Sequence, residues 1–468
     1  MTVTTLTAPT TTLPDLDTLR ASLRGPVLLA GDPGYDAARS CWNGMIDRRP
    51  AAVARCVGTS DVLACLRYVR AQRVPFTVRA GGHNIAGLCV ADGALMIDRS
   101  GMRGAWMDPR GRIVHAQPGA TLGDIDRETQ LHGRATVLGF VSNTGAAGLT
   151  LGGGFGYLTR KYGWTCDNVV SFDVITAEGE LVHASEKRNP DLFWGLRGGG
   201  GNFGIVTGME YRLQRLGPEI TGGLIAWRGE EAAEVLELFR RVSEEAPREL
   251  TCVALIRKAP PAPWLPPEMH GKLIVAMLLC HTGSARRADR DLARVLRHGE
   301  PVGNVVQRRP YVQQQALLDA TQPNGRRYYW KSEYLGRLGD DALEIFRRYG
   351  ERVTSPHSAM ILFQVGGAIA DEPDDLSPMG NRDAEYVLNV TGSWESPAED
   401  QVHTAWVREA WQAMKPFSTG GTYVNFQTAD EGPDRVRDAY GPHWDQLVRV
   451  KRRWDPENLF RANKNIAP

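Results

Sequence analysis

The sequence predicts a protein of the α+β class with two or three domains. The chain has 468 residues, which is more than one domain of ordinary size. Segments with helical and with strand periodicity are interspersed along it, and no internal repeat is visible. Glycine accounts for 51 residues, a share above the average of about 7%. Because this excess is clustered, the clusters are the main clue to function.

Composition and charge argue against several kinds of partner. Hydrophobic residues make up 42% of the chain and charged residues 23%, as in an ordinary globular enzyme. The formal net charge is +1, so no basic excess points to a nucleic acid or to an anionic membrane. The longest purely apolar run, 273–280, is much shorter than the roughly 18 residues that a membrane span needs.

The N-terminal segment and the cysteines predict a cytoplasmic protein. Residues 1–14 are rich in threonine and lack the charged and apolar segments of a secretory signal, so we expect a disordered tail. Seven cysteines stand at irregular spacing without a CxxC pair, which argues against a zinc ribbon or a redox dithiol. We therefore expect no bound metal, and thiols that are reduced and mostly buried.

Helix and strand signals lead into the first glycine cluster. Ser60 is expected to cap a helix over 61–72. A strand over 74–78 then runs into Arg79-Ala80-Gly81-Gly82-His83. Thr121 is expected to cap a second, short helix. Further strands are predicted over 95–97, 113–116, 205–213 and a hairpin formed by 169–176 and 181–184.

A domain boundary is predicted at 216–218, where a Leu-Gly-Pro sequence follows the last of these strands. The middle segment mixes helices and strands, and its proline-rich loop over 260–267 suits neither. In the last 50 residues, the alternation in 422–426 predicts a strand. Trp444, Leu447, Val448 and Lys451 share one face of a helix that Asp455-Pro456 ends.

The glycine clusters predict a diphosphate-binding site. Glycine lets successive backbone N–H groups form concave turns that bind phosphate oxygens. No GxxxxGK[ST] loop occurs, which excludes a P-loop. A GxGxxG match at Gly199, Gly201 and Gly204 continues into the strand-like Ile205-Val206-Thr207 rather than a helix, so a Rossmann site is disfavoured.

His83 is the most informative residue of the first cluster. It follows two glycines directly after a strand, which places it on a loop beside the expected phosphate-binding turns. A single histidine is more often structural than catalytic. An imidazole held on such a loop can, however, act as a nucleophile or as the attachment point of a cofactor.

At these residues the sequence resembles the berberine-bridge-enzyme-like FAD-linked oxidases of the vanillyl-alcohol-oxidase superfamily. The 79–83 segment is similar to the family's flavin-linking loop, and 148–156 (Gly-Leu-Thr-Leu-Gly-Gly-Gly-Phe-Gly) to its second loop. The 189–207 segment forms a third matching block. The 423–426 and 455–465 segments resemble the family's Tyr-x-Asn-aromatic motif and closing segment. These blocks stand in family order, whereas the middle of the chain matches only loosely.

The resemblance implies a two-part fold of the α+β class. After a tail and lead-in over 1–30, residues 31–217 would form a PCMH-type FAD-binding domain of two α/β subdomains. Residues 218–416 would form a substrate domain, an antiparallel sheet backed by helices that covers the flavin ring. Residues 417–468 would return to the FAD domain.

The resemblance also implies where FAD is bound. His83 would bond covalently to the 8α-methyl carbon of the flavin, a link that raises the redox potential and prevents loss of the cofactor. The other FAD-binding residues that it implies are Arg79, Gly81, Gly82, Asn84, Gly87, Pro118, Gly119, Thr144, Gly145, Gly148, Gly153, Gly154, Gly156, Gly204, Val206, Asn463 and Asn465.

The sequence departs from many relatives at the position of a second flavin link. Those relatives carry a cysteine eleven residues before the position of Gly152, where this chain has Val141. Cys166 lies nearby in the sequence, but after the triple glycine. We therefore expect a single histidyl link and no cysteinyl link.

Two residues of the closing segments are predicted to be catalytic. Tyr423 is the candidate base that removes a hydroxyl proton, since relatives place the equivalent tyrosine over the flavin. A free phenol has a pKa near 10 and needs help to do so at neutral pH. Asn425 would position the flavin or the substrate. Lys331 could face the pocket, although a solvated or ion-paired lysine is the favoured interpretation. Thr144 falls near the position that controls oxygen access in relatives.

The leading expectation is an oxidase that takes a hydride from a small molecule to flavin N5 and passes the electrons to O₂. The expected substrate is an alcohol on a sugar, a glycosylated metabolite or a natural product. Alternatives in the same class are C–N oxidation, oxidative ring closure in secondary metabolism, or a flavin dehydrogenase with another acceptor. Alternatives outside it are a nicotinamide-dependent Rossmann dehydrogenase and a non-catalytic protein that has kept the cofactor.

Overall fold

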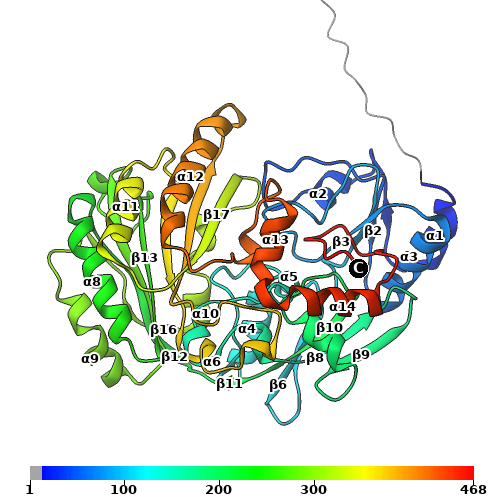
Figure 1. Cartoon of the computed structure of the whole chain (residues 1–468), viewed down its shortest axis with the longest axis horizontal. Coiled ribbons are helices and arrows are strands. Elements are labelled where there is room, and N and C mark those ends of the chain that lie inside the picture. The colour runs from blue at the N-terminus through cyan, green and yellow to red at the C-terminus, as the bar shows by residue number, and fades with distance from the viewer. Residues whose placement is uncertain (1–12) are drawn as a thin grey trace, which may run out of the picture.

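The computed structural model describes residues 13–468 and arranges them as two small sheets on one side and one large sheet on the other (Figure 1). Residues 1–12, which belong to the predicted tail, lie outside the described part. Leu13 and Pro14 do not continue a tail. Leu13 is 4% exposed in the first core, and the Tyr68 hydroxyl donates to the carbonyl of Pro14.

The first subdomain is a four-stranded sheet covered by helices. Three of its strands are parallel, and the order is β1 (Val27–Leu28), β2 (Ala52–Arg55), β4 (Leu95–Asp98), β3 (Phe76–Arg79). Its helices are α1 (Leu16–Ser22), α2 (Tyr35–Arg39) and α3 (Thr59–Gln72). The last of these begins one residue before the predicted cap Ser60, because Gly58 occupies the N-cap position.

The second subdomain is a five-stranded antiparallel sheet. Its order is β5 (Ala105–Met107), β6 (Ile113–Ala116), β10 (Ile205–Arg212), β8 (Val169–Ile175), β9 (Leu181–Ser185). Thr121 caps α4 (Leu122–Gln130) as predicted, in a reciprocal capping box with Asp124. The remaining elements are β7 (Arg134–Ala135), α5 (Ala146–Leu151), α6 (Thr159–Tyr162), α7 (Pro190–Leu196) and β11 (Gln214–Arg215).

The middle of the chain forms an eight-stranded antiparallel sheet. Its path is β15 (Gly303–Asn304), β12 (Glu219–Arg228), β14 (Leu273–His281), β13 (Leu250–Lys258), β18 (Ala359–Gln364), β19 (Tyr386–Trp394), β17 (Arg327–Leu335), and β16 (Gln307–Pro310) also pairs with β12. The helices are α8 (Ala232–Glu245), α9 (Ala285–Leu296), α10 (Tyr311–Gln315), α11 (Asp340–Glu351) and α12 (Asp400–Met414).

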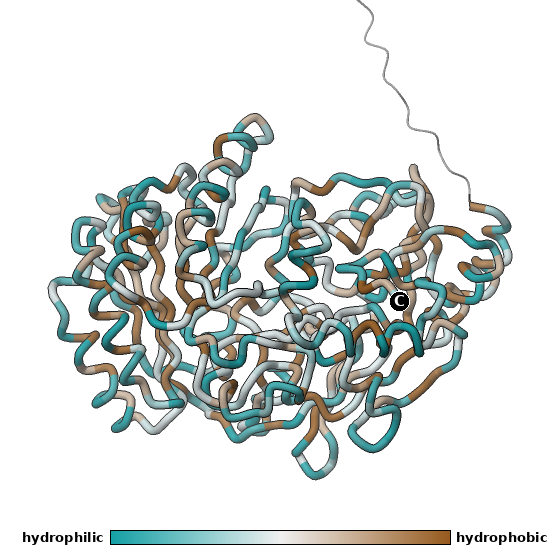
Figure 2. Tube along the Cα trace, in the orientation of Figure 1, coloured by the Kyte–Doolittle hydropathy of each residue, from teal (hydrophilic) through white to brown (hydrophobic). Residues whose placement is uncertain are grey.

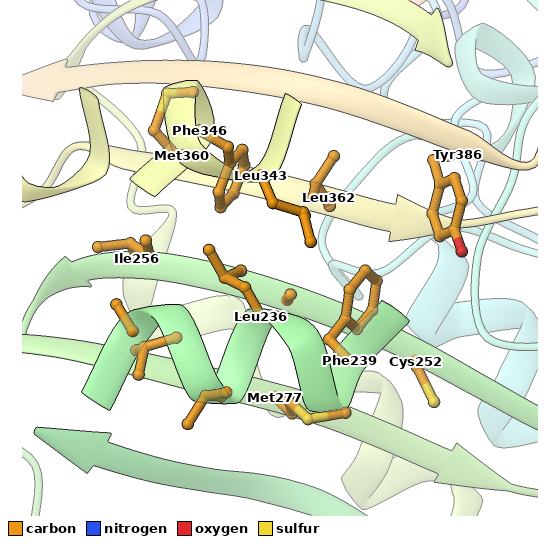
Figure 3. Close-up of a cluster of buried hydrophobic side chains, with 14 of the residues drawn as sticks. Leu236, Phe239, Cys252, Ile256, Met277, Leu343, Phe346, Met360, Leu362 and Tyr386 are labelled. Atoms are coloured by element: carbon orange, nitrogen blue, oxygen red, sulfur yellow. The ribbon is translucent and has the colours of Figure 1, made fainter. Parts of the chain in front are cut away.

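Helices cover one face of this large sheet and leave the other face for the rest of the molecule (Figure 1). Leu236 and Phe239 of α8 pack against Met360 and Leu362 of β18 in the core that Figure 3 shows. Hydrophilic and hydrophobic segments alternate along the outer helices, as expected for amphipathic helices on a core (Figure 2). The expected α+β architecture, with an antiparallel sheet backed by helices, is therefore confirmed.

The C-terminal segment returns to the side of the two small sheets (Figure 1), where α13 (Pro433–Tyr440) and α14 (Trp444–Trp454) share a hydrophobic core with α5. Leu447 and Val450 belong to the core of the second subdomain, and Asp455 ends α14 as predicted. The strand predicted over 422–426 is wrong, because a 3₁₀ turn, Val424–Phe426, stands there. None of the helices in residues 13–468 combines the length and the apolar character needed to cross a membrane.

Lys451, which is part of a buried ion pair, joins this segment to the glycine-rich turn at 198–204, the third glycine block. The Lys451 ammonium and the Asp455 carboxylate are 2.6 Å apart, and both side chains are fully buried. Lys451 Nζ also donates to the carbonyls of Asn202 and Phe460 at 2.8 and 3.0 Å. The Asn202 side chain in turn bonds the backbone of Lys464 and Ile466. One lysine thus holds the end of the chain against the glycine-rich turn.

Replacing Lys451 by Met should destabilise the protein by about 3–5 kcal/mol, because Asp455 would stay buried without its partner. The measurement is thermal or urea unfolding followed by circular dichroism. Arg453→Met is the matched control on the same helix, since Arg453 is exposed and its pair with Asp191 should contribute less than about 1 kcal/mol. Equal losses for the two variants would contradict this account of the tail.

Candidate functional site

A cavity of about 380 Å³ lies where the three sheets and the C-terminal segment meet. The glycine blocks, which are the glycine-rich segments 79–83, 148–156 and 198–204, line one part of it. Strands β17, β18 and β19 line another. Of the predicted site residues, those that line the cavity are Gly81, Gly82, His83, Asn84, Thr144, Gly145, Gly148, Gly204, Val206, Tyr423, Asn425 and Asn463.

The other predicted site residues stand outside this lining, and several of them shape the loops behind it. Gly153 and Gly154 have φ angles of +95° and +80°, and their carbonyls accept the backbone N–H groups of Cys166 and Thr165. Arg79 donates to the carbonyl of Ala38. The residues outside the lining are Arg79, Gly87, Pro118, Gly119, Gly153, Gly154, Gly156 and Asn465.

The His83 ring is held from two sides. Its Nε2 lies 3.1 Å from Oδ1 of Asn143, and the ring stacks on Trp42 with centroids 4.6 Å apart. With Oδ1 as the acceptor, this contact fits the tautomer in which Nε2 carries the proton and Nδ1 keeps a free lone pair. Burial lowers the pKa of His83 to about 4, and the bond to Asn143 opposes this shift only in part. The imidazole is therefore neutral and nucleophilic at physiological pH.

The glycine blocks fit a ligand that approaches the backbone closely. A Cβ added at Gly81 would lie 2.5 Å from the Cα of Gly145, so the two loops touch. Gly148 and Gly201 also line the cavity, and a Cβ at either would meet no protein atom within 4 Å. The space in front of them is thus open to a ligand, which agrees with a diphosphate held on backbone N–H groups.

Cationic side chains that the sequence analysis missed also line this cavity. Arg99 is 5% exposed, and its Nη1 donates to the carbonyl of Val206, a lining residue. Burial lowers the pKa of Arg99 to about 10, and its Nε has no partner in the described chain. Lys464 lines the cavity too, and burial lowers its pKa to about 8. Such groups fit the charge of a diphosphate.

Tyr423 and Asn425 come from the 3₁₀ turn that replaces the predicted strand. Asn425 Nδ2 donates to the Tyr423 hydroxyl at 2.9 Å and lies 3.1 and 3.2 Å from the carbonyls of Leu149 and Gly152 at the end of α5. Tyr423 is 1% exposed, and burial raises the pKa of its hydroxyl above the usual value. Its phenol consequently keeps its proton at neutral pH.

The large sheet turns alternate side chains into the cavity. Side chains on the opposite face, such as Leu362 and Val390, pack in the core under the helices. The strand residues that line the cavity are Trp330, Ile361, Phe363, Asn389 and Thr391. Trp42 contacts Trp330 at a centroid distance of 5.3 Å, so this wall stands next to the residue that stacks on His83.

Lys331 and Cys166 lie outside the cavity lining. Lys331 is on the helix side of β17, where its ammonium pairs with Asp430 at 3.1 Å and Glu431 at 3.2 Å. The ion-paired interpretation of this lysine is therefore confirmed. Cys166 is fully buried, its pKa is raised by burial, and its sulfur lies 3.9 Å from Asp167. All seven cysteines are buried and free.

Sequence reasoning did not identify Trp42, Asn143, Arg99 or the sheet residues of the cavity. Asn143 stands between the first and second matched segments of the first domain and could have been found as a polar residue beside Thr144. Trp42 and the residues of β17–β19 carry no local signal, since only the tertiary fold brings them to His83.

Two family descriptions match the chain at the segments that build this cavity. The family described as "FAD binding domain" matches residues 50–185, and the family described as "Berberine and berberine like" matches residues 422–467. The first range contains His83 and two glycine blocks, and the second contains Tyr423, Asn425 and Asn463. The Rossmann alternative is excluded, because the third glycine block leads into strand β10 and not into a helix.

Relatives match along almost the whole chain. The (R)-6-hydroxynicotine oxidase of Paenarthrobacter nicotinovorans is 30% identical over 458 residues, which cover 96% of this chain and 97% of the relative. The xylooligosaccharide oxidase of Thermothelomyces thermophilus is 27% identical over 97% of this chain and 94% of its own. The crystal structure of 6-hydroxy-D-nicotine oxidase from Arthrobacter nicotinovorans superposes with a TM-score of 0.86 at 27% identity, covering 96% and 98% of the two chains. The cavity, the matched segments and this full-length similarity agree, and the chain belongs to the berberine-bridge-enzyme-like family of FAD-linked oxidoreductases.

Proposed function

We propose that this FAD-linked oxidoreductase is an oxidase that holds its flavin through a covalent bond from Nδ1 of His83. The observation that carries the proposal is the orientation and protonation of that imidazole. Asn143 fixes Nε2 as the protonated nitrogen, Trp42 fixes the ring plane, and burial keeps the ring neutral. The free lone pair of Nδ1 is the one nucleophile that this arrangement presents at the end of the flavin-linking loop.

The chain's own residues supply binding and orientation for the cofactor. Backbone N–H groups of the glycine blocks and the cation of Arg99 would hold the diphosphate, and Asn463, which donates to the carbonyl of Gly201, would fix the closing segment beside it. When bound, FAD supplies a hydride acceptor at N5 and passes the two electrons on to O₂. Thr144 and Val141 line the cavity and would border the path of oxygen.

We further propose that the substrate is an alcohol-bearing small molecule, with Tyr423 next to the carbon that is oxidised. Tyr423 and Asn425 both line the cavity, beside the wall formed by the large sheet. Asn425 donates to the phenol oxygen, which favours its deprotonated form, but burial outweighs this contact and raises the pKa. Proton removal by Tyr423 is thus possible only for a small fraction of the molecules at neutral pH.

C–N oxidation is the second candidate, and the same site favours it. Among the residues that line the cavity in the described chain, none is an aspartate or a glutamate. An amine that binds in its neutral form needs no protein base to give up a hydride, whereas an alcohol does. The full-length relative named (R)-6-hydroxynicotine oxidase is an oxidase of a nitrogen-containing compound, which agrees with this candidate.

Changing His83 to Ala should release the flavin from the protein. Acid-precipitated wild type should keep its yellow absorbance after washing, and the His83→Ala pellet should be colourless, because the variant lacks the imidazole that forms the bond. His115→Ala is the control, since His115 pairs with Glu210 away from the cavity. A wild-type pellet without flavin, or a yellow His83→Ala pellet, would refute the histidyl link.

The pH dependence of flavin attachment should report the lowered pKa of His83. Attachment needs the neutral imidazole, and with a pKa of about 4 nearly all of it is neutral at pH 5. The rate of attachment to flavin-free protein at pH 5 should therefore be close to that at pH 7. An unperturbed histidine with a pKa near 6.5 would instead slow the reaction about 25-fold over this interval. Timed acid precipitation with added FAD measures the rate, and a loss of about 25-fold would contradict the lowered pKa of His83.

Tyr423→Phe should separate the two substrate classes. If Tyr423 is the base for an alcohol, kcat/KM should rise about tenfold per pH unit between pH 6 and 9, because the raised pKa leaves little phenolate, and the variant should lose this rise. Peroxide release from a screened substrate gives the rate. Tyr157→Phe is the control, a buried tyrosine outside the cavity lining. A rise that persists in Tyr423→Phe would instead assign the titration to an amine of the substrate.

A further inference from the structure

We propose that Asn389 and Thr391 form a neutral hydrogen-bonding subsite that selects an uncharged, ring-containing substrate through its hydroxyl or N–H group. This Asn389–Thr391 pair stands on β19, in the face of the large sheet that lines the cavity. The inference rests on the proposed function, because it names the substrate class of the same cavity.

One side-chain oxygen of each residue is buried without a partner. Asn389 and Thr391 are each 2% exposed. Oδ1 of Asn389 and Oγ1 of Thr391 have no hydrogen-bond partner within residues 13–468. Buried polar groups are satisfied in almost all proteins, and an unpaired one is costly to stability. Atoms left unpaired at the wall of a cavity are therefore explained by a ligand that satisfies them.

The strand register makes these two residues a pair rather than separate side chains. They stand two positions apart on one strand, so they project from the same face. Asn389 lies opposite Ile361 on β18, and Thr391 lies opposite Trp330 on β17. Asn389 also lies opposite Ser332 on β17, and Thr391 opposite Ala359 on β18. The Ser332 hydroxyl is already bonded to Thr422 Oγ1 at 2.9 Å, so a substrate polar group that enters this wall meets the pair.

The surroundings of the pair disfavour a charged group on the substrate and favour a flat, neutral ring. Trp330 contacts Phe426 at a centroid distance of 5.3 Å, and Phe363 contacts Phe140 at 5.0 Å. All four aromatic residues line the cavity, and no acidic residue of the described chain does. An ionic group placed here would lose its hydration without a partner of opposite charge. A flat, neutral ring would instead keep favourable contacts on several sides.

The pair also lies near the position where chemistry is proposed. Trp42 stacks on His83 and contacts Trp330, which is the cross-strand neighbour of Thr391. A substrate held by the pair would consequently lie beside the flavin that His83 is proposed to carry. The subsite then orients the substrate, and its effect should appear in binding before it appears in turnover.

The test is the affinity of the flavin-loaded protein for phenol and for anisole, measured by titration calorimetry. The two probes share a ring, but methylation removes the hydroxyl donor of phenol. The wild type should bind phenol about 3- to 10-fold more tightly than anisole, as expected for one or two hydrogen bonds. Asn389→Leu with Thr391→Val should bring this ratio close to 1, and Thr391→Val alone should lower it partly.

Ser393→Ala is the matched control on the same strand. Ser393 projects from the same face of β19 as the pair and has a buried, unpaired hydroxyl. It lies outside the cavity lining. Its replacement should leave the phenol-to-anisole ratio unchanged. A wild-type ratio near 1, or a ratio that survives in the double variant, would overturn the subsite. Acid precipitation of the same samples reports the flavin link separately, so that failure of the proposed function is distinguishable from failure of the subsite.

Discussion

The contact between two glycines is the constraint on which the site depends. Gly81 precedes His83, and Gly145 precedes α5, and a Cβ on either would lie under 3 Å from the Cα of the other. Only because both residues lack a side chain can the flavin-linking loop lie against the N-terminal end of α5. That approach sets His83 beside Asn143, which lies two residues before Gly145 in the loop that leads into α5, and the cavity opens in front of Gly148.

The cavity divides into two parts with different chemistry. The glycine blocks, Arg99 and Lys464 provide backbone donors and positive charge, which suits the diphosphate of FAD. The wall from the large sheet is largely aromatic and uncharged, and its unpaired polar atoms are the oxygens of Asn389 and Thr391 and the indole nitrogen of Trp330. The C-terminal segment closes the space between them, since Lys451 and Asp455 anchor its end and Asn425 bonds the end of α5. The proposed cofactor and substrate contacts therefore come from separate parts of the chain. The turn at 424–426 contacts both, through Asn425 on one side and Phe426 on the other.

Much of the cofactor site could be predicted from the sequence, because its signals are local. A Gly-Gly-His sequence after a strand is contiguous, and so are the glycine blocks, so their order along the chain identifies the family. The cap at Thr121 and the end of α14 at Asp455 were predicted for the same reason. The substrate wall could not be predicted, since β17, β18 and β19 meet only after the sheet has formed, and residues such as Asn389 have no motif around them.

The error at 422–426 has a physical cause. Tyr423, Val424, Asn425 and Phe426 alternate in polarity, which resembles a half-buried strand. In the structure the segment makes a 3₁₀ turn, because Tyr423 is buried among aromatic residues while Asn425 bonds the carbonyls at the end of α5. Two different tertiary partners, and not pairing with a strand, account for the alternation. The helix that Ser60 was expected to cap begins one residue before Ser60, because Gly58 takes the N-cap position.

The central claim is that Nδ1 of His83 carries the flavin, and peptide mass spectrometry of the purified holoenzyme tests it most directly. After proteolysis, the account predicts that the peptide containing His83 carries the added mass of the flavin, and that fragmentation assigns the mass to His83. It also predicts that the peptide containing Cys166 is unmodified. An unmodified His83 peptide from flavin-loaded protein, or flavin attached to another residue, would contradict the account.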